Sequence, residues 1–182
     1  AHLLESQIEE GLADIDALAT RPFLIQSMQQ LNVQPNDRSA LDYLNSNLPS
    51  LIQSGFSAIA IHDKQDNQVS KAGHFSEKQA QALILNEETG TALIWDNEFI
   101  LHTTETILDQ QGQRIGSITA ESTLPQLTRS FSEIRSIGET GTFMLCALPK
   151  THTQEMACLI SQIDGVQFRH LVRVVGEGVL PM

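Results

Sequence analysis

The chain has 182 residues, which suits one large domain or one and a half small ones. Its hydrophobic content of 41% supports a sizeable core, and its low glycine and proline content argues against disorder. A formal net charge of −11 excludes nonspecific binding to nucleic acid or anionic membranes as the default, because phosphate contacts need clustered Lys and Arg.

The first third of the sequence predicts three helices. Apolar residues recur at helical spacing in the first of them, at Leu4, Ile8, Leu12, Ile15 and Ala19. Pro22 interrupts this helix, because proline has no N–H to donate and disfavours helical geometry at the preceding residue. A second helix is expected over 22–32 and a third over 40–55, with Asp37 or Ser39 as the cap of the third. The first helix has no capping signal, so we expect it to continue from a preceding segment.

The apolar pattern changes to a period of two at residue 56, which predicts strands. The segment "FSAIAIH" alternates, "DKQDN" is a turn cluster, and "QVSKA" returns as a second strand. Residues 75–90 predict a helix, with Ser76 and Gln79 as a capping box. Three strands follow, "TALIW", "FILHTTETIL" and "RIGSITAEST", and their short joins demand antiparallel neighbours. The order of elements predicts an α+β fold, with one antiparallel sheet and helices packed on it.

The last third of the chain begins with an amphipathic helix over 124–138 and continues with the apolar strands "TFMLCALPK" and "QEMACLISQ" and the piece "HLVRVV". Cys146 and Cys158 are symmetric in number about His152, the centre of the loop between the two strands. In a symmetric hairpin these cysteines lie directly opposite each other, where Cα atoms are as close as ~4.5 Å. They could bridge in an oxidising periplasm, and the alternative is two buried reduced thiols in an apolar region.

This series of elements resembles the Cache family, the extracytoplasmic PAS-like sensor domains of bacterial receptors. The segment "ATRPFLIQSM", followed by "GFSAIAIHDKQDNQVSKAG", is similar to the family's first hairpin, which reads as apolar strand, D-x-x-G-x and strand, with Asn67 where glycine is commoner. The run "ILDQQGQRIGSITAESTLPQL" is similar to the closing hairpin and exit helix. The runs "IGETGTFML" and "VGEGVLPM" resemble parts of the second, membrane-proximal module of tandem members.

The resemblance implies a membrane-distal sensor module over 1–130 and part of a second PAS-like module over 131–182. It also implies a periplasmic, ligand-sensing part of an inner-membrane receptor, such as a histidine kinase, a diguanylate cyclase or a chemoreceptor. Such a protein is attached to the membrane through segments outside this chain. Amino-acid-binding members carry an Arg-x-Trp-Tyr run, whereas here no arginine stands two residues before Trp95, so the amino-acid ligand class is not supported.

In a PAS-like sheet the ligand lies between the sheet face and the segment that crosses it, which we expect over 73–90. Such a pocket needs an apolar lining and a few convergent polar groups. The candidates are Trp95, His102 and Thr104, with His62 and His74 behind them. The alternative is that Trp95 fills the core and that the histidines are solvated or bonded to the backbone.

Arg21, at the helix break, could hold an anionic ligand through a bidentate guanidinium contact, or it could pair with Asp14 or Asp16. A metal site at His62, Asp63 and His74 lacks the usual ligand spacing, so we expect no metal and no cofactor. The sequence has no G-x-S-x-G, P-loop or Rossmann fingerprint, so the region is predicted to be non-catalytic, although the full-length protein could carry a kinase or cyclase domain.

The function hypothesis is a population shift. A small molecule bound by the sheet would favour one arrangement of the N-terminal helix, and that helix would relay the bias toward the membrane and could also form a homodimer. The alternative is a PAS-type dimerisation or interaction module that binds no ligand. A secreted hydrolase would need a nucleophile–base pair that we do not find in the sequence.

Overall fold

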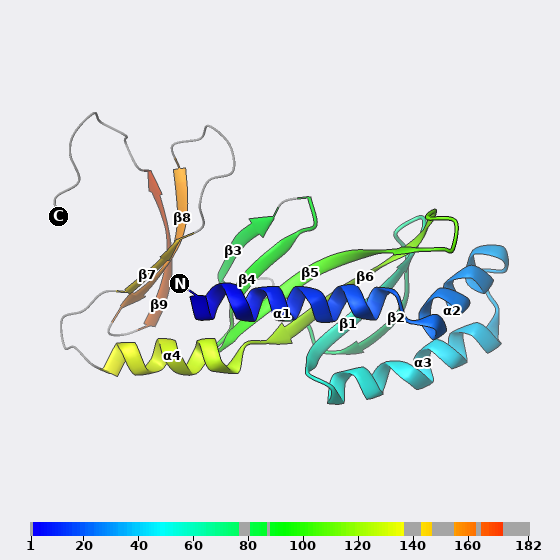
Figure 1. Ribbon diagram of the computed structural model, residues 1–182, viewed down its shortest axis with the longest axis horizontal. Helices are drawn as coiled ribbons and strands as arrows, with labels where there is room; N and C mark the ends of the chain where they lie inside the picture. Colours follow the sequence, from blue (N-terminus) through cyan, green and yellow to red (C-terminus); the bar gives the residue numbers. More distant parts are fainter. Residues whose placement is uncertain are drawn as a thin grey trace.

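A computed structural model of the chain describes residues 2–76, 81–86, 88–136, 143–146, 155–162 and 165–172, with side chains described over 5–76, 83–86 and 88–133 (Figure 1). The described helices are α1 (His2–Ala19), α2 (Pro22–Val33), α3 (Arg38–Gln53) and α4 (Pro125–Ser136). The strands of the larger sheet are β1 (Phe56–Asp63), β2 (Gln68–Gly73), β3 (Gln81–Asn86), β4 (Thr91–Trp95), β5 (Phe99–Leu108) and β6 (Arg114–Thr123). The strands of the smaller sheet are β7 (Phe143–Cys146), β8 (Glu155–Gln162) and β9 (Gly165–Val172).

Local backbone chemistry confirms the helix break at Pro22 and the cap at Asp37, although α3 begins and ends two residues earlier than the expected 40–55. Arg21 is extended, with φ −67° and ψ 133°, and Pro22 stands in the first turn of α2, where its missing N–H leaves no hydrogen bond unmade. Asp37 rather than Ser39 caps α3, because its carboxylate accepts the N–H groups of Ser39 and Ala40 at 2.9 and 3.2 Å.

The larger sheet has the strand order β2-β1-β6-β5-β4-β3, and every neighbouring pair is antiparallel. The helix predicted over 75–90 is wrong, because residues 81–86 form β3, which pairs with β4. Leu83 is buried while Ile84 is 50% exposed, the alternation of an edge strand with one face on the core. Gln79 of the expected capping box lies outside the described residues.

All four helices pack on one face of this sheet. One core lies beneath α1, α2 and α3, and it includes Ile15, Met28 and Ile59. A second core gathers Leu93, Phe99 and apolar residues of α4. No described helix covers the opposite face, which we call the helix-free face (Figure 1).

Two tight turns lie at one end of the sheet and share one geometry. In the β1–β2 turn, Asp63 Oδ1 accepts the N–H groups of Gln65 and Asn67, and Asp109 plays the same part in the β5–β6 turn. The left-handed residue of the first turn is Asp66, with φ 63°, and its counterpart in the second turn is Gly112. The expectation that Asn67 takes the glycine position is therefore wrong by one residue.

The smaller sheet has the order β7-β8-β9, and β8 and β9 lie near β3 (Figure 1). Cys146 is the register partner of Cys158, so the expectation that they lie opposite each other is confirmed at the backbone. Their side chains lie outside the described ones, and the bridge stays a prediction, as does the boundary between two modules near residue 130. Within the described residues, no helix is long and apolar enough to cross a bilayer.

Candidate functional site

The helix-free face carries a polar stripe across its central strands. Register places His102 of β5 beside Glu121 of β6, and Thr104 beside Thr119. The two threonine hydroxyls lie 2.9 Å apart. On the other side of β6, the partner of Glu121 is Ala58, which is fully buried.

Glu121 is the centre of this stripe. It is only 1% exposed, and three donors surround its carboxylate. Oε2 accepts the backbone N–H of Ser76 at 2.8 Å, and Oε1 lies 2.8 Å from the Ser76 hydroxyl and 2.9 Å from Nδ1 of His102. A buried carboxylate needs such partners, because an unpaired charge in the interior is strongly unfavourable.

These contacts decide the ionisation of Glu121. Burial raises the pKa of its carboxyl, but the hydrogen bonds from His102 and Ser76 outweigh burial and hold the pKa below its ordinary value. The side chain is therefore an anion at neutral pH. We call Glu121, His102 and Ser76 the Glu121 cluster.

The chain that leaves β2 crosses the helix-free face and supplies Ser76. Gly73 starts this crossing with φ +73°, and a Cβ there would lie 2.1 Å from the Ser57 carbonyl oxygen, so only glycine fits. Phe75 then packs edge-on against His102, with ring centroids 6.2 Å apart. The ammonium of Lys71 lies 5.2 Å from the centre of the Phe75 ring, within the range of a cation–π contact.

The structure brings some of the sequence-derived candidates together and separates others. His102 and Thr104 share the polar stripe. His62 lies on the same face, but its partner on β6 is Ser117, two residues before Thr119 and therefore farther from Glu121. His74 is exposed in the segment that leaves β2.

Trp95 lies on the opposite face and cannot line a pocket with His102. It pairs in register with Phe99 and packs against the rings of Phe99 and Phe131, with centroids 4.8 and 5.5 Å away. This placement agrees with the alternative in which Trp95 fills the core.

Arg21 is exposed on the helical side of the sheet, away from the stripe. Among the described residues it forms no ion pair with Asp14 or Asp16. Asp16 instead approaches Glu105 of β5: burial raises the pKa of the Glu105 carboxyl, and the nearby Asp16 carboxylate raises it further.

Sequence reasoning missed Glu121, because β5 and β6 are irregular next to their turn. A regular hairpin that continues from the Leu108–Arg114 pair would place His102 opposite Ala120. The shift between Ile107 and Leu108 moves the pairing by one residue and brings in Glu121.

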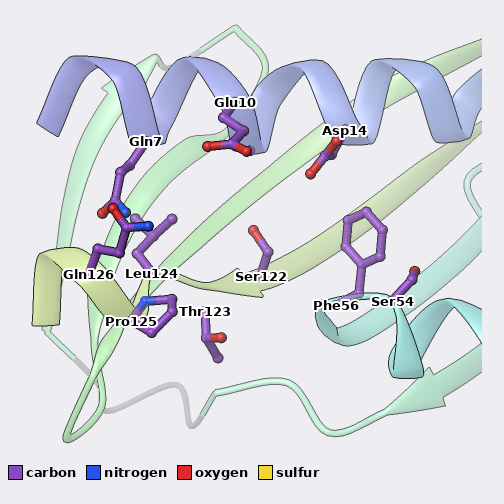
Figure 2. A pocket seen from close by; sticks show the side chains of 12 residues that line it. Gln7, Glu10, Asp14, Ser54, Phe56, Ser122, Thr123, Leu124, Pro125 and Gln126 are labelled. Atoms are coloured by element: carbon purple, nitrogen blue, oxygen red, sulfur yellow. The ribbon is translucent and has the colours of Figure 1, made fainter. Parts of the chain in front are cut away.

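A cleft of about 230 Å³ lies on the helical side, between α1 and the junction of β6 with α4 (Figure 2). Gln7, Glu10 and Asp14 line it from α1, and Ser122 lines it from β6. The amide oxygen of Gln7 and the hydroxyl of Ser122 are buried there without a hydrogen-bond partner.

Among the described residues, no group of three or more His, Cys, Asp or Glu side chains could hold a metal ion. No protein-family model matches this chain, and no curated protein matches it.

Proposed function

We propose that this chain is a periplasmic ligand-sensing domain of a bacterial membrane receptor, with a PAS-like fold of the Cache type. Two features support the proposal. The sequence resembles that family over most of its length, and a six-stranded antiparallel sheet with an N-terminal helical region is compatible with a PAS-like fold.

The observation that carries the proposal is the Glu121 cluster beneath a crossing segment. A buried anion, a histidine and a serine converge on a sheet face that no described helix covers. Small molecules bind where a few polar groups converge within an apolar surround. A ligand that competes with Ser76 for Glu121, or that bridges the two, would move the crossing segment.

Strand β5 offers a short route from this site to α1. His102 points to the helix-free face, while its neighbour Leu101 packs on α1 at Gly11. A change in β5 at His102 would therefore alter the packing of α1 on β5, and α1 is the helix that we expect to continue toward the membrane. The ligand would act by favouring one of two arrangements of α1.

A thermal-shift screen of the chain with small acids, amines and purines tests sensing. A true ligand of this site should raise the melting temperature of the wild type and lose most of that effect in His102→Gln and Ser76→Ala. The matched control is Asp42→Asn, on the exposed surface of α3, which should keep the full shift. A ligand whose effect survives both cluster variants binds elsewhere.

The homodimer expected through α1 has less support. The exposed residues of α1 include Glu5, Glu9 and Asp16, whereas its described apolar residues Ile8, Leu12 and Ile15 belong to the two cores. A screen without any hit, together with a stable dimer in light scattering, would favour the interaction module over the sensor.

A further inference from the structure

We propose that the cleft beneath α1 binds a small organic ammonium ion. This site goes beyond the sensing proposal, because it lies on the helical side of the sheet while the Glu121 cluster lies on the helix-free face. Its volume of about 230 Å³ is below the ~300–1,000 Å³ of pockets for drug-sized ligands, so the guest is a small molecule.

The first argument is the unpaired acceptors. Gln7 is only 9% exposed, yet its amide oxygen has no hydrogen-bond partner. The hydroxyl oxygen of Ser122, a half-buried residue, is itself buried and also has no partner. Figure 2 shows the Gln7 side chain pointing from α1 toward the β6–α4 junction. Buried polar groups are nearly always hydrogen-bonded in folded proteins, so two unpaired ones in a single cleft indicate a missing partner. A hydrogen-bond donor would satisfy both, because the amide oxygen of Gln7 only accepts and a serine hydroxyl oxygen can accept as well as donate.

The second argument is charge. Glu10 and Asp14 stand one helical turn apart on α1, and both side chains line the cleft (Figure 2). The lining residues include no Lys, Arg or His. Neither carboxylate belongs to an ion pair found among the described residues. The cleft thus offers acceptors and negative charge together.

An ammonium group matches this set of partners. It carries three donors, no acceptor and one positive charge, so it can bond to buried oxygens and lie near two carboxylates. The remaining lining is partly apolar, with Phe56, Leu124 and Pro125, which suits a short alkyl chain. Calcium fits less well, because it takes 6–8 oxygen ligands, several of them carboxylates.

Gly11 keeps the cleft open. A Cβ at this position would lie 3.6 Å from the Ser122 hydroxyl and 2.6 Å from Leu101 Cδ2. A larger side chain would therefore occupy the space next to one of the two unpaired acceptors.

The test is calorimetric titration of the 182-residue chain with n-butylammonium. Saturable binding is expected, with no binding of 1-butanol or butyrate, which share the alkyl chain but lack the positive charge. Gln7→Leu and the double variant Glu10→Gln/Asp14→Asn should each weaken binding by about tenfold or more. The matched control Glu9→Gln/Asp42→Asn removes two charges outside the cleft and should leave the affinity unchanged.

A second measurement separates a binding site from a packing fault. Gln7→Leu removes an unpaired buried acceptor, so the free variant should melt at a higher temperature than the wild type while binding the amine less well. Higher stability with unchanged amine binding would overturn the proposal. So would stronger stabilisation by calcium chloride than by the amine, or the absence of saturable amine binding.

The two proposals fail separately. His102→Gln should leave butylammonium binding intact, because it alters the other face of the sheet. Loss of amine binding in His102→Gln would place the amine at the Glu121 cluster and overturn the cleft site. A screen that finds no ligand for the Glu121 cluster would leave the cleft result standing.

Discussion

Glu121 keeps a negative charge inside the sheet because its three donors replace the water that burial removes. Its pKa in the folded state lies below the ordinary value, although burial alone would raise it. The ionised form therefore stabilises the fold above the unfolded-state pKa of about 4.3, and this contribution is lost as the pH falls through the folded-state pKa.

Glu121→Gln keeps the shape of this side chain and removes its charge. We expect the free energy of unfolding at pH 7 to fall by about 1–3 kcal/mol, because the three donors lose a charged acceptor. The gap from wild type should narrow below about pH 4, where the native carboxylate also becomes protonated. Urea unfolding followed by the fluorescence of Trp95, the single tryptophan, measures both effects.

The control for this prediction is Glu88→Gln, at an exposed turn position. It should change the free energy of unfolding by no more than about 0.5 kcal/mol. Equal losses in the two variants would mean that the charge of Glu121 has no special role.

The pKa of Glu105 is shifted in the opposite direction from that of Glu121. Burial and then the Asp16 carboxylate raise its pKa, so its contribution favours the fold below the unfolded-state pKa of about 4.3 and is lost as the pH rises through the folded-state value. We expect Glu105→Gln to raise the free energy of unfolding at pH 7 by up to about 0.5 kcal/mol, since the pair is partly solvated. Thermal melts at pH 7 should show the gain, and melts near pH 3.5 should not.

Asp16→Asn provides the check on that pair. It should give a smaller gain than Glu105→Gln, because it relieves the repulsion but not the burial of Glu105. The double variant should gain less than the sum of the two single changes. If the double variant gained the full sum of the two single changes in the free energy of unfolding, the two carboxylates would not repel each other. High salt should reduce the gain in either single variant.

At the scale of elements, the contact of α1 with β5 depends on a glycine. Alanine at position 11 would improve helix propensity by about 1 kcal/mol, but its Cβ would lie 2.6 Å from Leu101 Cδ2. Overpacking of this kind costs about 1–3 kcal/mol, so we expect Gly11→Ala to lower the free energy of unfolding overall. Chemical denaturation of the variant measures the balance.

A second change tests the cause. Leu101→Val removes a methylene group at the contact, so Gly11→Ala should be less harmful in that background than in the wild type. The comparison site is Ala13, exposed on α1, where Ala13→Gly should cost about 1 kcal/mol through helix propensity alone. A stabilising effect of Gly11→Ala in the wild type would show that α1 can move away from β5 without cost.

Strand β3 shows why one element was predicted incorrectly. Leu83 faces the core and Ile84 faces solvent, but the run is short and follows a pattern that resembles a capping box. Ser76 of that pattern instead donates its hydroxyl to Glu121. The choice between helix and strand was decided by pairing with β4, which a local pattern does not contain.

At the scale of the whole molecule, the second sheet permits a covalent link between β7 and β8. Opposite residues of an antiparallel pair have Cα atoms about 4.5–5.5 Å apart, within the span of a disulfide, and Cys146 lies opposite Cys158. In protein isolated from an oxidising compartment, such as the proposed periplasm, we expect the two cysteines to be bridged, because disulfides form and persist there. A bridge around so short a loop would stabilise the fold by about 3 kcal/mol.

Thiol titration of the unfolded, non-reduced protein tests this prediction. We expect no reactive thiol before reduction and two after it, since the sequence contains two cysteines. Two reactive thiols before reduction would contradict the bridge and would favour the interaction module with reduced cysteines.

The sequence by itself determined the elements whose signals are local. The break at Pro22, the cap at Asp37 and the turns at Asp63 and Asp109 all depend on contacts within five residues. The symmetry of a single hairpin likewise placed Cys146 opposite Cys158.

The tertiary structure alone decided which side chains meet. The one-residue shift near Leu108 paired His102 with Glu121, and the register of β4 turned Trp95 to the other face. The cleft beneath α1 formed because a helix from the start of the chain packs over the end of β6. Such long-range pairings depend on register and packing, and a slip of one residue exchanges the two faces of a strand.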